Sequence, residues 1–120
     1  MKKEIEVKVG DYSFVFYGDP KILEFIVETL ELMSMKNKDY SRNSDDNFAT
    51  FRLYRLAGIR PEQGIVARMI DKIARIGNLI NADDIAVKDE SIEDTLRDLI
   101  AYSAILAAYL KDEYGGEDED

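Results

Sequence analysis

Two sets of charged side chains in this sequence could together bind a phosphorylated small molecule and a metal ion. Residues 36–75 hold nine basic and five acidic side chains, and the rest of the chain holds 7 basic and 20 acidic ones, so the two parts carry net charges of +4 and −13. Guanidinium groups bind phosphate oxygens, and carboxylates bind hard divalent cations. The charge separation therefore favours a phosphate ligand held together with a metal. The alternative is an acidic helical protein with an uneven surface.

Three acidic residues form a row along the last predicted helix, which spans about 89–113. Glu90, Asp94 and Asp98 lie at i, i+4 and i+8, and their stripe continues into the apolar segment Leu99–Leu110. Neighbouring carboxylates repel one another, so a bound cation would stabilise the row. The alternative is a solvated first turn, where the helix dipole favours acids. Asp98 lies too far along the helix for that explanation.

A second pair of acids lies on the first predicted helix, from Pro20 to about Met35. Glu28 and Glu31 are one turn apart on one face, as a metal site carried by a helix requires. The alternative is the solvent-exposed side of an amphipathic helix.

The basic residues of the predicted helix that begins at Pro61 also have a helical spacing. Arg68, Asp71, Lys72 and Arg75 lie at i, i+3, i+4 and i+7. They could bind phosphates, or they could form an outer face on which Asp71 pairs with its basic neighbours.

The polar segment 36–47 is predicted to be a loop that follows the first helix. It begins with Lys36, Lys38 and Tyr40, which could bind a phosphate and stack on a base. The alternative is a loop of turn-forming residues without a ligand.

The elements that must position these residues are mainly helices. Capping residues mark their ends: Asp19 precedes Pro20, and Gly58 ends a short helix over Phe48–Ala57. Before them, apolar residues alternate on both sides of Gly10-Asp11, which predicts a β-hairpin over 1–18. Its predicted register pairs Val9 with Tyr12, Val7 with Phe14 and Ile5 with Phe16.

These elements predict one mainly α domain over residues 1–120, a four-helix bundle-like fold with an N-terminal β-hairpin. The helical core spans 19–114, and an acidic, disordered tail follows at 115–120. The segment Leu99–Leu110 is apolar on nearly all sides, which is more than one small bundle can bury. It therefore favours a subunit interface in a homo-oligomer, a dimer or a tetramer.

The composition narrows the chemistry. There is no Cys and no His, so any metal should be bound by oxygen, with Mg²⁺ or Mn²⁺ as the best candidates. The start of the chain has no signal-peptide pattern, and the longest apolar run is too short for a bilayer. We therefore expect a cytoplasmic protein without a membrane partner. The net charge of −9 argues against direct nucleic-acid binding.

Taken together, the motifs resemble a family of phage and bacterial proteins, the nucleotide modification associated domain 1 family. The resemblance covers roughly residues 20–112 and lies outside the hairpin. It is carried by these segments: Lys-Asn-x-Asp-Tyr at 36–40, Asn47-Phe48, Arg68-x-x-Asp71-Lys72-x-x-Arg75, the run 89–95 (DESIEDT), Asp98-Leu99 and Tyr102. It implies a nucleotide ligand.

A looser similarity extends to the MazG-like all-α nucleoside triphosphate pyrophosphohydrolases, which are commonly dimers or tetramers with Mg²⁺ between two acidic pairs. Glu28-x-x-Glu31 matches the first pair. Glu90, followed by Glu93 and Asp94, corresponds to the second, where the group has Glu-x-x-Asp. The gap between the two pairs is longer than is usual in the group.

The resemblance implies Mg²⁺-dependent hydrolysis of a (deoxy)nucleoside triphosphate to monophosphate and pyrophosphate, in the cytoplasm of a bacterium or a phage-infected host. Asp98 would orient or activate water. The implied ligand set is Glu28, Glu31, Glu90 and Asp94 for the metal, Lys36, Lys38, Arg68, Lys72 and Arg75 for phosphates, and Tyr40 for the base.

Two alternatives come from other classes of protein. One is a non-catalytic protein that sequesters or senses a nucleotide, in which the acidic rows are structural. The other is an interaction module that uses the hairpin as a docking edge and binds no small molecule.

Overall fold

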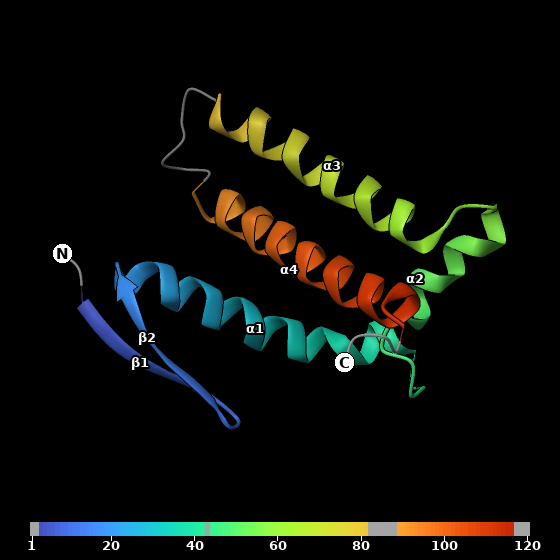
Figure 1. Cartoon of the computed structure of the whole chain (residues 1–120). Helices are drawn as coiled ribbons and strands as arrows, with labels where there is room; N and C mark the ends of the chain where they lie inside the picture. Colours follow the sequence, from blue (N-terminus) through green and yellow to red (C-terminus); the bar gives the residue numbers. More distant parts are fainter. Residues whose placement is uncertain (1–2, 43, 82–88, 117–120) are drawn as a thin grey trace.

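The computed structural model describes residues 3–42, 44–81 and 89–116, without the side chains of Lys3, Lys38, Asp89 and Glu90. It confirms a mainly α fold with an N-terminal β-hairpin (Figure 1). The elements are β1 (Lys3–Val9), β2 (Tyr12–Gly18), α1 (Pro20–Ser41), α2 (Ala49–Arg52), the 3₁₀ helix η1 (Leu53–Ala57), α3 (Pro61–Ile80) and α4 (Asp89–Tyr114).

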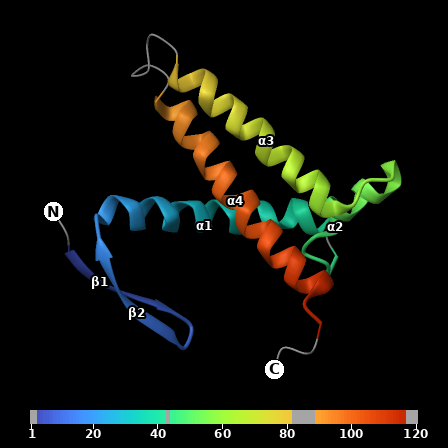
Figure 2. The same ribbon diagram turned by 45° about the horizontal axis from the view of Figure 1, so that its top comes forward.

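The three long helices are arranged around α4. Helices α3 and α4 lie side by side and antiparallel, whereas α1 crosses α4 (Figures 1 and 2). None of the helices in the described ranges is long and apolar enough to pass through a bilayer. Most of the acidic tail predicted at 115–120 lies outside the described residues.

The hairpin has the predicted register. Its turn is possible because Gly10 adopts a positive φ of 59°. Two strands alone are marginally stable, and the side chains near the turn stay exposed. The observed pairs include Val9 with Tyr12, Val7 with Phe14 and Ile5 with Phe16.

Helix α1 begins where its capping residues predict. The Asp19 carboxylate accepts a hydrogen bond from the backbone N–H of Lys21 at 2.9 Å, and Pro20 follows at the first helical position. The predicted end near Met35 is wrong, because the helix continues to Ser41 and ends at Arg42 in the left-handed conformation.

Tertiary contacts explain the longer helix. The Thr50 hydroxyl donates to the Asp39 carbonyl at 2.9 Å, and the Tyr40 ring packs 5.0 Å from the Phe51 ring. These contacts stabilise a segment whose composition is typical of a loop. As a result, Lys36 and Tyr40 lie one turn apart on the same face of a helix.

The buried core is small and lies where α2, α3 and α4 meet. Its apolar members are Phe51, Ile65, Ile105 and Tyr109. The segment Leu99–Leu110 contacts α3 on one side and α1 on another, while Ile100 and Leu110 stay partly exposed. As the sequence predicts, its apolar surface is more than the single chain buries.

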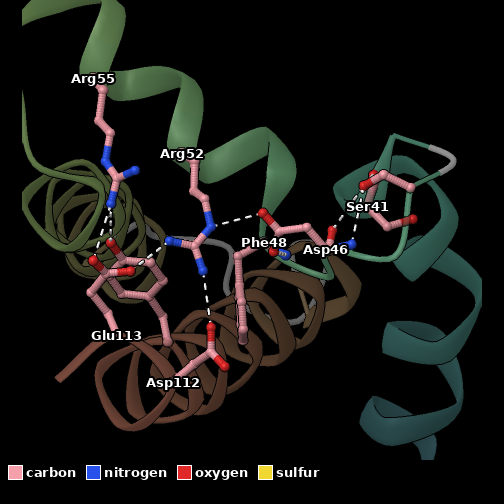
Figure 3. Close-up of polar contacts among 9 residues, drawn as sticks. Ser41, Asp46, Phe48, Arg52, Arg55, Asp112 and Glu113 are labelled. Atoms are coloured by element: carbon pink, nitrogen blue, oxygen red, sulfur yellow. Dashed lines mark hydrogen bonds and ion pairs between the residues drawn. The ribbon is translucent and has the colours of Figure 1, made fainter. Parts of the chain in front are cut away.

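One side chain, Arg52, joins the middle of the chain to the end of α4 (Figure 3). Its guanidinium contacts Asp46 at 2.7 Å, Asp112 at 2.9 Å and Glu113 at 2.7 Å, and it lies 5.0 Å from the centre of the Tyr109 ring. Asp112 and Glu113 lie in the last turn of α4, where the helix dipole disfavours carboxylates. The arginine offsets that unfavourable placement.

Replacing Arg52 should strongly destabilise the fold. The Arg52→Ala variant leaves three carboxylates without their shared cation, so we expect its free energy of unfolding to fall by about 2–4 kcal/mol. Urea denaturation followed by circular dichroism at a fixed protein concentration measures this. Lys111→Ala, an exposed site on the same helix, is the control and should leave the midpoint unchanged. Equal midpoints for both variants would contradict the role assigned to Arg52.

Candidate functional site

The carboxylate of Asp98 is the point where the three long helices bring charged side chains together. Lys72 Nζ on α3 lies 2.9 Å from Asp98 Oδ2, and Lys36 Nζ on α1 lies 3.7 Å from Oδ1. The predicted catalytic residue and two of the predicted phosphate ligands are therefore neighbours. Lys36 reaches α4 because it lies on a helix and not on the predicted loop.

Arg68 lies one turn before Lys72 on α3 and is held by aromatic residues. Its guanidinium donates to the Tyr54 hydroxyl at 2.6 Å and to the Tyr102 hydroxyl at 3.1 Å. It also lies 5.8 Å from the ring centres of Phe51, Tyr54 and Tyr102. The hydrogen bond to Tyr54, followed by that to Tyr102, raises the pKa of Arg68 despite its partial burial. The cation is fixed in place by neutral groups.

Tyr54 can approach α3 because of a glycine. Gly64 is buried in the first turn of α3, and a Cβ atom there would overlap the Tyr54 ring. The absence of a side chain therefore lets Tyr54 lie against the helix and bind Arg68 four residues later.

These side chains border an open cavity of about 410 Å³. Its wall combines two cations, one carboxylate and two phenol groups, so it suits a ligand with several oxygen atoms. Its lining residues are Tyr54, Ala67, Arg68, Asp71, Lys72 and Tyr102.

Tyr40 connects this cluster with a second cavity. Burial, and then the nearby Tyr102 and Asp98, raise the pKa of the Tyr40 phenol. The same residue lines a cavity of about 350 Å³ between α1 and α4. The amides of Asn37 and Asn47 face each other there, with a hydrogen bond of 3.3 Å between them. Apolar side chains form the rest of this second cavity: Met33, Phe48, Ala104, Ile105 and Ala108.

Two of the predicted metal ligands, Glu28 and Asp94, contact a guanidinium group. Arg97 on α4 contacts Glu28 at 3.0 Å, Asp94 at 3.2 Å and Glu93 at 3.5 Å, and it lies over the Phe25 ring. Acids of α1 and α4 therefore converge as predicted, but a guanidinium neutralises them.

The other predicted ligands do not complete a metal site among the described residues. Glu31 is exposed on α1, and the Glu90 side chain lies outside the described part of the structure. Within the side chains that are described, no three acidic residues are grouped so that they could hold a metal ion. As they stand, the described residues do not fit Mg²⁺, and the metal stays a prediction.

The remaining predicted phosphate ligands lie apart from the cluster. Arg75 donates to the Thr95 hydroxyl at 3.1 Å and joins α3 to α4 two turns beyond Arg68. The Lys38 side chain lies outside the described residues. In the described contacts, Asp71 pairs with neither Arg68 nor Arg75, so the expected ion-paired outer face is absent there.

Several residues of the site carry little signal in the sequence. Tyr54 and Tyr102 are far from Arg68 along the chain, and nothing near them indicates that they bind it. The spacing of Arg97 from Glu93 and Asp94 is a detectable signal for local ion pairs. That signal does not extend to Glu28 on another helix.

Neither a protein-family model, nor a curated protein, nor a solved structure matches this sequence. The site must therefore be interpreted from its own geometry.

The raised pKa of Tyr40 predicts a pH dependence of stability. Because the phenol binds its proton more tightly in the folded state, its contribution is complete below pH 10 and is lost as the pH rises through the folded-state pKa. The Tyr40→Phe variant should thus lose less stability than the wild type between pH 9 and pH 11, as measured by urea denaturation. The control is Tyr17→Phe, at an exposed hairpin position. An alkaline loss as steep in Tyr40→Phe as in the wild type would contradict the prediction.

Proposed function

We propose that this protein binds a phosphorylated small molecule, with a nucleotide as the best candidate. The observation that supports the proposal is the convergence of Lys36, Arg68 and Lys72 on one side of α4, next to an open cavity. Three cations near one another repel, and a multiply charged anion relieves that repulsion.

Asp98 has a particular role in this proposal. Its carboxylate lies between two ammonium groups, as an oxygen of a bound phosphate would. It therefore keeps the lysines in place in the absence of ligand, and it competes with an incoming anion. Arg68, held only by neutral partners in the described contacts, offers its full charge to the phosphate.

The second cavity favours a nucleotide over a simple phosphate. It has apolar walls and two aromatic residues, Tyr40 and Phe48, and Tyr40 also reaches the charged cluster. Asn37 and Asn47 together offer a hydrogen-bond donor and an acceptor at its edge. A flat heterocycle with adjacent donor and acceptor groups, as in every nucleobase, would satisfy both amides.

A second candidate is the Mg²⁺-dependent pyrophosphohydrolase that the sequence predicts. The proximity of Glu28 on α1 and Asp94 on α4 favours it, because the resemblance implies metal ligands from two helices. A metal ion would have to displace Arg97, which occupies the place between these acids. In this candidate Asp98 positions water, and the enzyme is a cytoplasmic homo-oligomer of phage or bacterial nucleotide metabolism.

Binding can be tested without catalysis. Pyrophosphate and each common dNTP and NTP, with EDTA present, should raise the melting temperature of the wild type. Lys72→Ala should weaken this binding by roughly tenfold, because it removes a charge-assisted contact. Lys21→Ala, at an exposed site outside the cluster, is the matched control. No stabilisation of the wild type by any of these ligands would refute the proposed site.

Asp98→Asn separates the two candidates. If Asp98 only competes with the ligand, the variant should bind pyrophosphate several-fold more tightly than the wild type. If Asp98 is catalytic, the wild type should convert a nucleoside triphosphate to monophosphate and pyrophosphate only when Mg²⁺ is present. The variant should lose this turnover. Chromatography of the products measures the second outcome. Asp11→Asn, at an exposed position in the hairpin turn and outside both the cluster and the predicted metal ligands, is the control for a general effect of charge.

A further inference from the structure

Helix α3 carries a second apolar stripe that faces away from its own chain. Val66, Ile70, Ile73, Gly77 and Ile80 follow one another at intervals of four, three, four and three residues. This is the spacing with which one helix packs along another. The four large side chains are each between 41% and 59% exposed. We name this set the α3 stripe.

The α3 stripe differs from the face of α3 that packs on α4. That inner face includes the buried Ile65, together with Met69 and Lys72. The α3 stripe lies about a quarter of a turn away from that inner face around the helix axis. From Val66 to Ile80, the positions within the stripe and next to it carry no charged side chain. Its neighbours Ala67 and Ala74 are small and exposed.

Gly77 lies within the α3 stripe. A Cβ atom at this position would meet no atom of the described residues within 4 Å. A glycine inside a helix lowers its stability by about 1 kcal/mol relative to alanine. No contact among the described residues compensates that loss, whereas a second helix could approach closely here.

Helix α4 extends the same apolar surface. Leu110 is exposed on the part of α4 that follows its contact with α3 in the helical rotation. Because α3 and α4 are antiparallel, this part and the α3 stripe lie on the same side of the pair. Ser103 and Ala107, also exposed, lie on the same part of α4.

The chain as a whole has too much surface for a compact monomer. Its accessible surface is 8783 Å², whereas a compact chain of 13.7 kDa exposes about 6,600 Å². Its radius of gyration is 17.0 Å, against about 14 Å for a compact domain of this length. The excess of about 2,200 Å² exceeds the 800 Å² or so that each partner buries in a standard interface. The exposed hairpin accounts for part of this excess.

The arrangement of the helices explains why the surface is open. Helices α3 and α4 lie side by side, α1 crosses α4 (Figures 1 and 2), and the molecule measures 44 × 41 × 26 Å. Stable domains bury the apolar faces of their helices between two layers. Among the described residues, no second layer covers the side of α3 that carries the α3 stripe.

We propose that a second copy of this chain supplies that layer by packing its α3 stripe on the first. A two-fold axis relates the two copies, so one patch suffices for both sides of the interface. Two α3–α4 pairs then form a four-helix core across the interface. An uncharged stripe suits a copy of itself, because neither copy has to bury a charge.

This interface leaves the candidate site accessible. Arg68 lies nearly opposite the α3 stripe on the helix, and Lys72 points toward α4 and α1. The proposed dimer therefore does not depend on whether the candidate site binds a ligand. The hairpin, with its own exposed apolar side chains, is the competing surface.

Sedimentation velocity over a range of concentrations tests the interface. The wild type should sediment as a dimer. Ile73→Asp, at the middle of the α3 stripe, should weaken the dimer by roughly hundredfold, because two carboxylates would be buried in it. Leu56→Asp is the matched control, because Leu56 is 87% exposed outside the stripe, and it should leave the dimer unchanged.

Cross-linking keeps the test valid if Ile73→Asp fails to fold. The chain has no cysteine, so Ile73→Cys and Leu56→Cys each carry a single thiol. If the two stripes overlap fully, the two-fold axis passes near Ile73, and the two copies of this residue lie close together. A short bismaleimide should therefore cross-link Ile73→Cys but not Leu56→Cys. A wild type that stays monomeric at the highest accessible concentrations would overturn the proposal. A dimer that survives Ile73→Asp but dissociates in Phe14→Asp would overturn it in favour of the hairpin.

Discussion

The guanidinium of Arg52 is the contact on which the arrangement of the site depends. By binding carboxylates of the preceding loop and of the last turn of α4, it fixes α2 against the end of that helix. This places Phe51 in the core and directs the following 3₁₀ helix toward α3. Tyr54 can then lie on Gly64 and hold Arg68. The ion pairs of Arg52 thus determine the position of Arg68, a cation more than a dozen residues later in the chain.

Local patterns predict the parts of the fold that local physics determines. Strict alternation around Gly10-Asp11 fixes the register of the hairpin, and proline and glycine mark where helices begin and end. The end of α1 could not be predicted in this way. Residues 36–41 have the composition of a loop, and they are helical because Thr50 and Phe51 contact them from a later part of the chain.

In the candidate site, too, local patterns predict some residues, while others depend on tertiary contacts. The spacing of charges indicates Lys36, Lys72 and Asp98, and the structure brings these three together. Spacing within one helix could not show that tyrosines would hold Arg68, or that Arg97 would lie among the predicted metal ligands. Both contacts depend on which faces of the helices pack together. The apolar pattern does not determine these faces, because many apolar residues of this chain stay exposed.

The central position of α4 also has a consequence for how the chain folds. Helices α3 and α4 are consecutive and antiparallel, and few residues separate them along the chain, so their pairing costs little loop entropy. By contrast, the contact between Glu28 and Arg97 joins residues 69 apart, and that between Arg52 and Glu113 joins residues 61 apart. Long loops cost more entropy to close, and contacts that need them form late. We therefore expect the α3–α4 pair to form first, and α1 with its hairpin to pack on it afterwards.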